Sequence, residues 1–118
     1  MKTILIIDDD RDIRQRFKKA LKGGGYGVIE APDALEVANA IMRDMDKIEL
    51  ILLDIQMPEI NGRDIYDIVH DYAPSIPIMV ASVMPIQDQK LRIPHAQEYF
   101  QKSDGETVLL KKVGSILG

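Results

Sequence analysis

At 118 residues, 46% of them hydrophobic and 29% charged, the chain has the length and composition of one globular domain, not of a disordered or multidomain protein. Its formal net charge of −4, without a basic block, argues against nucleic acid and anionic membranes as direct partners. The absence of cysteine excludes disulfides, thiolate metal sites and a cysteine nucleophile, and without a membrane-length apolar run we expect a single cytoplasmic domain over residues 1–118.

Short apolar runs without alternation predict β-strands that are covered on both faces, as in a parallel sheet. These strands are expected at residues 4–7, 28–29, 50–53, 78–81 and 99–100. Apolar residues at helical spacing lie between the runs and predict helices. The helices are expected around residues 13–21, 34–45, 65–72 and 109–117, with a less regular one between 85 and 94.

Capping residues mark the ends of the predicted helices. Asp10 and Asp33 can cap helix N-termini, the glycines at 23–25 can end the first helix, and Pro85 suits a first helical turn. The resulting alternation of strands and helices predicts an α/β fold with right-handed crossovers and a doubly wound parallel sheet. In such a sheet, binding sites gather at the carboxyl ends of the strands, near the point where the strand order reverses.

Acidic residues follow two of the predicted strands. Asp8 and Asp9 come directly after the first strand, and Asp54 comes directly after the third. At an effective dielectric constant of about 20, two carboxylates about 5 Å apart repel by roughly 3 kcal/mol, so several in one cleft require a cation. Carboxylate oxygens in an open cleft favour Mg²⁺, which commonly binds phosphoryl groups. The sequence therefore predicts a metal-assisted phosphoryl site.

Two further polar residues stand at the ends of later strands. Ser82 follows the run IMVA, and Lys102 follows EYFQ. A hydroxyl, an ammonium and a metal ion would together neutralise and orient a phosphoryl group. Taken singly, Asp10 is best explained as a helix cap, Ser82 as a strand-end hydroxyl and Lys102 as a surface charge. Their shared position at strand ends favours a common site.

This pattern resembles the receiver domain of two-component response regulators, and the resemblance covers essentially the whole chain. It is carried by the acidic pair Asp8 and Asp9, by the segment LLDIQMPEING at residues 52–62, by Ser82 and by Lys102. The middle segment is the most specific part. The resemblance implies a flavodoxin-like, five-stranded parallel sheet of order 2-1-3-4-5 with five helices.

The resemblance also implies a phosphoacceptor and a metal site. Asp54 would accept a phosphoryl group from the phosphohistidine of a histidine kinase or a histidine phosphotransfer protein. Mg²⁺, with Mn²⁺ as a substitute, would be held by Asp9, Asp54 and the backbone carbonyl of Gln56, while Asp8 would act through water. Such a domain is not a conventional enzyme, because its activities are self-phosphorylation from a donor and slow self-hydrolysis.

A switch is implied as well. Lys102 would pair with Asp54 and then with a phosphoryl oxygen, and the Ser82 hydroxyl would move to another phosphoryl oxygen while the Tyr99 ring turns inward. These movements would alter the face formed by the fourth helix, fifth strand and fifth helix. That face is the expected contact for a downstream effector or output domain, and the candidate surface for a homodimer.

Two positions are expected to adjust the lifetime of the phosphoryl group, and a third departs from the family pattern. Gln56 and Met84 stand where the family adjusts the lifetime of the phosphoryl group, Gln56 by positioning or excluding water and Met84 by shielding, so slow dephosphorylation is expected. Ser103 follows Lys102, where the family usually has proline. A non-proline cis bond costs about 2.5–4 kcal/mol, so we expect a trans peptide bond here and leave open a different placement of Lys102.

Two other functions fit part of the sequence. Asp8 and Asp10 form an Asp-x-Asp pattern that resembles the haloacid-dehalogenase phosphatases, in which Asp8 would be the nucleophile and Asp10 the general acid. The chain is short for that family and lacks a convincing later acidic motif. Ser103 and the irregular fourth helix suggest instead a receiver-like binding module that no longer uses phosphorylation. No output domain is visible, so direct nucleic-acid binding is not expected.

Overall fold

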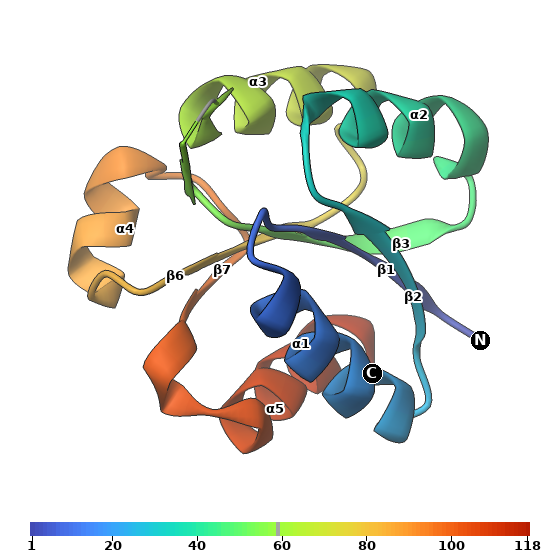
Figure 1. Cartoon of the computed structure of the whole chain (residues 1–118), viewed down its shortest axis with the longest axis vertical. Coiled ribbons are helices and arrows are strands. Elements are labelled where there is room, and N and C mark those ends of the chain that lie inside the picture. The colour runs from blue at the N-terminus through green and yellow to red at the C-terminus, as the bar shows by residue number, and fades with distance from the viewer. Residues whose placement is uncertain (59) are drawn as a thin grey trace.

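The computed structural model describes residues 1–58 and 60–118, and over these residues the chain forms a five-stranded parallel sheet flanked by five α-helices (Figure 1). The sheet consists of β1 (Thr3–Ile7), β2 (Gly27–Ala31), β3 (Ile48–Leu53), β6 (Ile78–Ser82) and β7 (Glu98–Gln101). The helices are α1 (Arg11–Gly23), α2 (Ala34–Asp44), α3 (Gly62–Tyr72), α4 (Ile86–Arg92) and α5 (Glu106–Leu117). Two short strands, β4 (Gln56–Met57) and β5 (Ile60–Asn61), pair antiparallel outside this sheet, and a 3₁₀-helix, η1 (Lys102–Asp104), follows β7.

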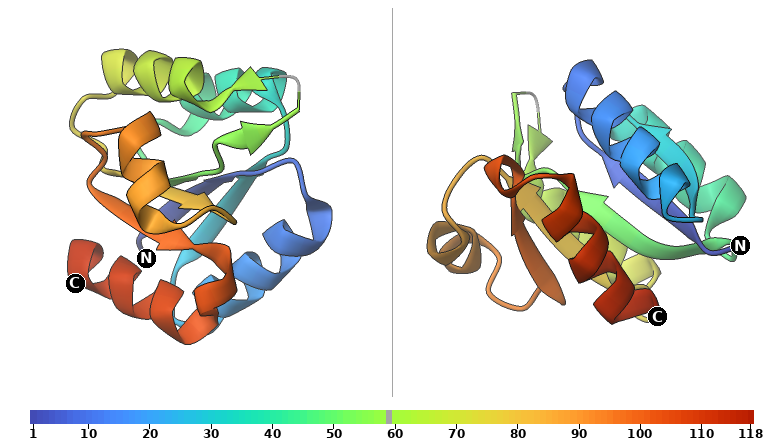
Figure 2. Two further views of the ribbon diagram at one scale, coloured as in Figure 1. Left: turned by 90° about the vertical axis from the view of Figure 1, so that its left-hand side faces the viewer. Right: turned by 90° about the horizontal axis from the view of Figure 1, so that it is seen from below.

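The strand order of the sheet is β2-β1-β3-β6-β7, which confirms the predicted order 2-1-3-4-5. Helices α1 and α5 lie together on one side of the sheet, while α2 and α3 lie on the other (Figures 1 and 2). The order reverses at β1, because the chain passes to β2 on one side of it and then to β3 on the other. The carboxyl ends of β1 and β3 therefore flank the topological switch point, where α/β sheets bind their ligands.

Each face of the sheet buries its own apolar cluster. In β1, Leu5 and Ile7 contribute to the cluster under α2 and α3, whereas Ile4 and Ile6 contribute to the cluster under α1 and α5. Successive side chains of a strand point to opposite faces, so a strand covered on both sides needs apolar residues at every position. This requirement explains the uninterrupted runs that predicted the strands.

The predicted helix caps are confirmed at both aspartates. Asp10 accepts hydrogen bonds from the backbone N–H groups of Asp12 and Ile13, and Asp33 accepts one from Glu36. Pro85 was expected in the first turn of the fourth helix, but it lies at the N-cap, with extended backbone angles, one residue before α4. Proline suits both positions because the N–H group it lacks would have no partner inside the helix.

Two predicted apolar stripes are wider than the buried faces of their helices. On α2, Val37 and Ala40 are buried whereas Ala38 is exposed, and on α3, Ile68 and Tyr72 are 53% and 71% exposed. A helix that rests on a sheet buries only the residues directly above the strands, so the next row of side chains faces solvent. No helix in the described part of the chain is long and apolar enough to cross a membrane.

Candidate functional site

The predicted acidic residues meet at the carboxyl ends of β1 and β3. Ile7 of β1 pairs with Leu53 of β3, and the Asp54 N–H donates to the Ile7 carbonyl at 2.8 Å, so the residues that follow the two strands are neighbours. Asp8, Asp9 and Asp54 each offer a carboxylate oxygen, and these oxygens lie within 4.8 Å of one another. The sheet thus brings Asp54 to an adjacent pair of acids that lies far earlier in the chain.

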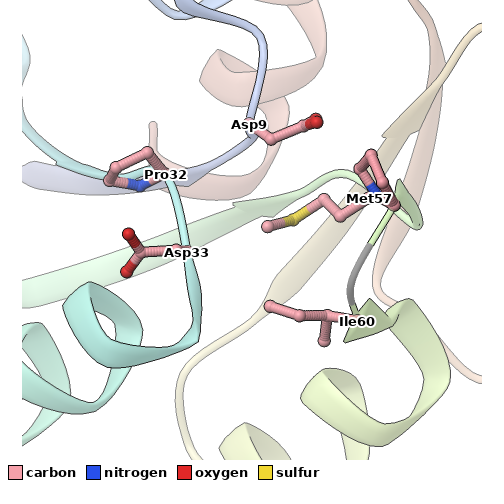
Figure 3. A pocket seen from close by; sticks show the side chains of 6 residues that line it. Asp9, Pro32, Asp33, Met57 and Ile60 are labelled. Atoms are coloured by element: carbon pink, nitrogen blue, oxygen red, sulfur yellow. The ribbon is translucent and has the colours of Figure 1, made fainter.

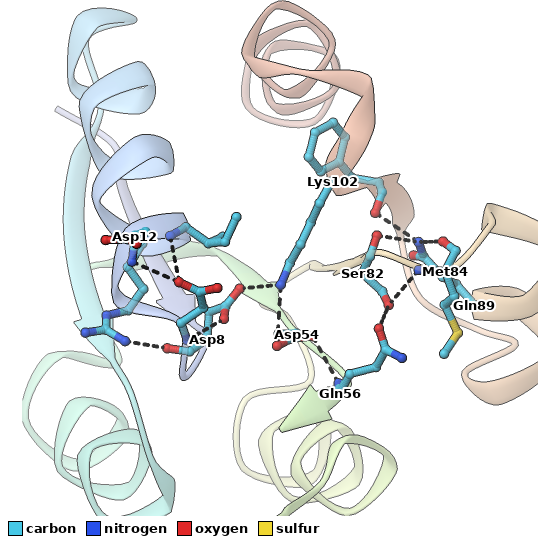
Figure 4. Close-up of polar contacts among 12 residues, drawn as sticks. Asp8, Asp12, Asp54, Gln56, Ser82, Met84, Gln89 and Lys102 are labelled. Atoms are coloured by element: carbon cyan, nitrogen blue, oxygen red, sulfur yellow. Dashed lines mark hydrogen bonds and ion pairs between the residues drawn. The ribbon is translucent and has the colours of Figure 1, made fainter. Parts of the chain in front are cut away.

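Lys102 provides the positive charge at this cluster. Asp8 and Asp54 are only 2% and 3% exposed, whereas Asp9 faces solvent. Lys102 Nζ lies 2.7 Å from Asp8 Oδ2 and 3.5 Å from Asp54 Oδ2 (Figure 4). The sequence led us to expect a pair with Asp54, but the shorter contact is with Asp8. A buried cation is needed here because two buried carboxylates without one would be strongly destabilising.

The electrostatic environment makes Asp54 a weaker acid than usual. Burial raises the pKa of Asp54 to about 6, and the negative charge of Asp8 acts in the same direction. The Gln56 N–H, which donates to Asp54 Oδ1 at 3.0 Å, and the Lys102 ammonium oppose this rise. At neutral pH the Asp54 carboxyl is therefore ionised, and a carboxylate is the form that can act as a nucleophile.

The backbone at Lys102 follows the expectation drawn from Ser103. The chain contains no cis peptide bond within the described residues, so the Lys102–Ser103 bond is trans. Lys102 is the first residue of η1, and its side chain extends back to the cluster formed by Asp8 and Asp54. Serine in place of the usual proline therefore leaves the lysine within reach of both carboxylates.

The donor set at the cluster suits a hard cation. The three carboxylates supply only oxygen ligands, and nitrogen or sulfur donors are absent from the group formed by Asp8, Asp9 and Asp54, which favours Mg²⁺ or Mn²⁺ over softer metals. Asp9 also borders an open hollow of about 200 Å³ (Figure 3). The other residues that line this hollow are Pro32, Asp33, Met57, Pro58 and Ile60. Of the three acids, Asp9 is therefore the one that a cation in this hollow would meet first.

Ser82 lies fully buried at the end of β6, and its hydroxyl is engaged by Gln56. Ser82 Oγ donates to Gln56 Oε1 at 2.7 Å and accepts a hydrogen bond from the Met84 N–H at 3.2 Å (Figure 4). Gln56 thus contacts Asp54 through its backbone and Ser82 through its side chain. The Met84 side chain packs against the apolar cluster under α2 and α3.

The Tyr99 ring is already inside the molecule. Its side chain is buried, its hydroxyl donates to the Ile93 carbonyl, and the same hydroxyl accepts a hydrogen bond from the Ala96 N–H at 3.2 Å. Lys90 Nζ of α4 lies 5.7 Å from the centre of the ring, within the range of a cation–π contact. Tyr99 therefore joins β7 to α4 and to the segment that follows this helix.

Sequence reasoning missed a buried amide beside Ser82. Gln89 on α4 is 0% exposed, and its Nε2 donates to the carbonyls of Met84 at 2.9 Å and Phe100 at 3.0 Å. It thereby links the β6–α4 loop to β7. The signal was present, because Gln89 stands at helical spacing from Ile86 and Ile93, both of which pack into the core. A polar residue on the inward stripe of a helix requires buried partners.

Comparison with known proteins gives matches along nearly the whole chain. The family model described as response regulator receiver domain matches residues 4–114. The response regulator MprA of Mycobacterium leprae is 26% identical over 116 residues, which are 97% of this chain and 50% of MprA. The transcriptional regulatory protein CpxR of Escherichia coli is 30% identical over 118 residues, which are 99% of this chain and 50% of CpxR. The chain thus spans about half the length of these relatives.

Solved structures share the fold. A CheY-like response regulator receiver domain protein from Methanospirillum hungatei superposes with a TM-score of 0.87 at 26% identity, covering 98% of this chain and 92% of its own. The response regulator protein TrrA from Thermotoga maritima, solved in complex with Mg²⁺-BeF, gives a TM-score of 0.82 at 27% identity, covering 98% and 99% of the two chains. Both matches extend over the sheet and the helices on its two sides.

Proposed function

This chain belongs to the response regulator receiver family, and we propose that residues 1–118 form a phosphorylation-dependent signalling switch whose phosphoacceptor is Asp54. One observation carries the proposal. The carboxylates of Asp8, Asp9 and Asp54 lie within 4.8 Å of one another, and Lys102 contacts two of them. In such a cluster Lys102 and a cation held by the acids can offset the negative charge of a phosphoryl group, and the buried Asp54 carboxylate can attack phosphorus.

In the proposed reaction, an Asp54 oxygen attacks the phosphorus atom of a donor phosphohistidine. The new O–P bond forms as the P–N bond breaks, and the donor imidazole leaves with the electron pair of that bond. Lys102, 3.5 Å from Asp54 Oδ2, offsets charge on a phosphoryl oxygen. In the slower self-hydrolysis, a water molecule attacks the phosphorus atom, the O–P bond to Asp54 breaks, and inorganic phosphate leaves.

A divalent cation is part of the proposal. Asp9, Asp54 and the Gln56 backbone carbonyl would hold Mg²⁺ or Mn²⁺, with Asp8 acting through water. When bound, the cation supplies positive charge opposite the oxygens of the phosphoryl group. Asp9 suits direct ligation because it is exposed beside the open hollow. Asp8 suits an indirect role because its Oδ2 is 2.7 Å from Lys102 and its Oδ1 accepts from the Asp10 N–H.

The remaining site residues are assigned to the switch and to the lifetime of the phosphoryl group. Ser82 would bind a phosphoryl oxygen, and Tyr99 would couple that event to the face formed by α4, β7 and α5. Gln56 and Met84 would slow the loss of phosphate. A phosphoryl lifetime no longer than that of fast-cycling receivers would contradict this last assignment.

The proposed partners follow from the chemistry of the site. A histidine kinase or histidine phosphotransfer protein in the cytoplasm would supply the phosphoryl group, and a downstream effector or output domain would read the altered face. The relatives MprA and CpxR, which are about twice as long as this chain, support a role within such a regulator. Neither nucleic acid nor a membrane is proposed as a direct partner of these residues.

The same face is the proposed homodimer surface. It carries Leu91 of α4, whose side chain is 82% exposed. We expect phosphorylation to increase the sedimentation coefficient, and substitution Leu91→Glu to reverse that increase. Sedimentation that is identical before and after phosphorylation would contradict dimerisation through this face.

Phosphoryl labelling tests the central proposal. Wild type and Asp54→Asn are incubated with a small phosphodonor and Mg²⁺, and the acyl phosphate is mapped by mass spectrometry. Asp71→Asn on the exposed side of α3 serves as the control for removal of a surface carboxylate. We expect labelling at Asp54 in the wild type and in the control only. Label at Asp8 would instead favour the phosphatase chemistry, and an unlabelled wild type would favour a binding module.

A further inference from the structure

We propose that the Gln56 side chain is a positioning group that holds the Ser82 hydroxyl away from the phosphoryl group, so that Gln56 and the phosphoryl oxygen compete for one hydrogen bond. This inference rests on the function proposed above and deepens it. Gln56 would thus control the Ser82 hydroxyl, in addition to positioning or excluding the water that attacks the phosphoryl group. The residue would thereby set the equilibrium between resting and switched states of the site.

The competition follows from the hydrogen bonds of Ser82. A serine hydroxyl carries a single proton and can donate only one good hydrogen bond at a time. Ser82 Oγ donates to Gln56 Oε1 at 2.7 Å, and the Met84 N–H fills an acceptor position on the same oxygen at 3.2 Å. While this arrangement holds, Ser82 has no proton to offer to a phosphoryl oxygen. The hydroxyl must leave Gln56 before it can bind one.

Gln56 is placed to act between the acceptor and the serine. Its backbone N–H donates to Asp54 Oδ1 at 3.0 Å, and Gln56 pairs with Asn61 where β4 and β5 run antiparallel. These contacts fix the Gln56 backbone beside the acceptor. The residue itself is exposed, so its side chain can turn into solvent while the backbone stays in place. Figure 4 shows the side chain spanning the gap between Asp54 and Ser82.

The charge of the phosphoryl group decides the direction of the exchange. A hydrogen bond to a charged phosphoryl oxygen is roughly twice as strong as one to a neutral amide oxygen. Ser82 therefore donates its hydrogen bond to the phosphoryl oxygen instead of to Gln56. The loss of the hydrogen bond to Gln56 reduces the net binding free energy. Removing the acceptor on residue 56 should strengthen the binding of a phosphoryl analogue by about 2- to 10-fold, the range that corresponds to one net hydrogen bond.

A double-mutant cycle with beryllofluoride and Mg²⁺ tests this inference. The affinity is measured by titration for the wild type, Gln56→Met, Ser82→Ala and the double variant. Methionine has the length of glutamine without its amide acceptor. We expect Gln56→Met to bind about 2- to 10-fold more tightly than the wild type, and to have no effect when Ser82 is alanine. Gln87→Met on the exposed side of α4 is the control and should bind like the wild type.

The outcomes separate this inference from the proposed function. A merely structural role of Gln56 would change the affinity equally in both Ser82 backgrounds, and that result would overturn the competition while leaving Asp54 as the acceptor. An unchanged or weakened affinity of Gln56→Met would overturn it as well. If the wild type does not bind beryllofluoride, or if Asp54→Asn binds it equally well, the proposed function fails, and the inference fails with it.

Discussion

Lys102 Nζ lies 2.7 Å from Asp8 Oδ2, closer than its 3.5 Å approach to Asp54 Oδ2. The lysine therefore makes its closest contact with the acid that is not the proposed acceptor. Both carboxylates are buried, so each depends on this ammonium when no other cation is bound. The arrangement keeps one Asp54 oxygen less tightly held, which suits a group that must attack phosphorus.

Removal of Lys102 should destabilise the metal-free protein. We expect Lys102→Met to lower the free energy of unfolding by about 2–4 kcal/mol, because Asp8 and Asp54 are left buried without their cation. Urea unfolding with a chelator present measures this change. Addition of Mg²⁺ should recover more stability in the variant than in the wild type, since the ion replaces the missing charge.

Lys111→Met is the matched control for this change. Lys111 is an exposed residue of α5, so its substitution should alter the free energy of unfolding by less than about 0.5 kcal/mol. Equal stabilities of the Lys102 and Lys111 variants would show that the contact with Asp8 contributes nothing to the fold.

The pKa of Asp54 predicts an unusual dependence of stability on pH in the absence of metal. Burial raises this pKa from 3.8 to about 6, so between these values the folded protein retains a proton that the unfolded chain releases. The free energy of unfolding should therefore fall as pH rises through this window, with the full loss reached above about pH 6. The loss attributable to Asp54 is at most about 3 kcal/mol.

The comparison with Asp54→Asn isolates this contribution. Asparagine does not titrate, so the variant should lack the Asp54 part of the slope while other carboxylates titrate in both proteins. Urea unfolding at a series of pH values, with a chelator present, gives the difference between the two curves. A difference that does not change between pH 4 and pH 6 would contradict the raised pKa that burial gives this side chain.

Gly62 should be intolerant of any side chain. A Cβ atom at this position would lie 2.5 Å from Ile55 Cα, which is backbone and cannot move aside without shifting the loop after Asp54. We expect Gly62→Ala to lower the free energy of unfolding by about 1–3 kcal/mol and to weaken phosphoryl labelling. Circular dichroism with urea, followed by the labelling assay, measures both effects.

Gly23→Ala provides the opposite case. A Cβ atom at Gly23 would meet no atom within 4 Å, and the residue ends α1 without a positive φ. Alanine there should stabilise the protein by about 0.4–1 kcal/mol because it restricts the unfolded chain. If both substitutions have the same effect, the close contact between Gly62 and Ile55 is not the cause.

The sheet could be predicted from sequence because its signals, although short, are uninterrupted and recur between helical segments. Uninterrupted apolar runs mark buried parallel strands, and strand ends mark one edge of the sheet, while the strand order that makes Asp8 and Asp54 neighbours came from the resemblance to receiver domains. The β4–β5 hairpin was not predicted, because two-residue strands carry no periodicity. Residue 59, within the segment that carried the resemblance, lies outside the described residues.

The contacts of individual side chains could not be predicted in the same way. Lys102 lies beside Asp54 as expected, but its shorter contact is with Asp8, and the hydrogen bond from Ser82 to Gln56 was not predicted. These contacts depend on small differences in distance between side chains from segments remote in sequence, as the 2.7 Å and 3.5 Å contacts of Lys102 show. Residue type and spacing give the neighbourhood of a group but not which of two neighbours it contacts.

Gln89 is the residue whose substitution best tests the link between the site and β7. Its buried Nε2 donates to the carbonyls of Met84 and Phe100, and Gln89→Met keeps the length of the side chain while removing both donors. The Met84 and Phe100 carbonyls would then be buried without these hydrogen bonds, which should lower the free energy of unfolding by about 1–3 kcal/mol. Gln87→Met makes the same change on the exposed side of α4 and should have an effect below about 0.5 kcal/mol. Urea unfolding of the two variants gives the comparison, and a Gln89 variant as stable as its Gln87 counterpart would mean that this amide does not hold the β6–α4 loop to β7.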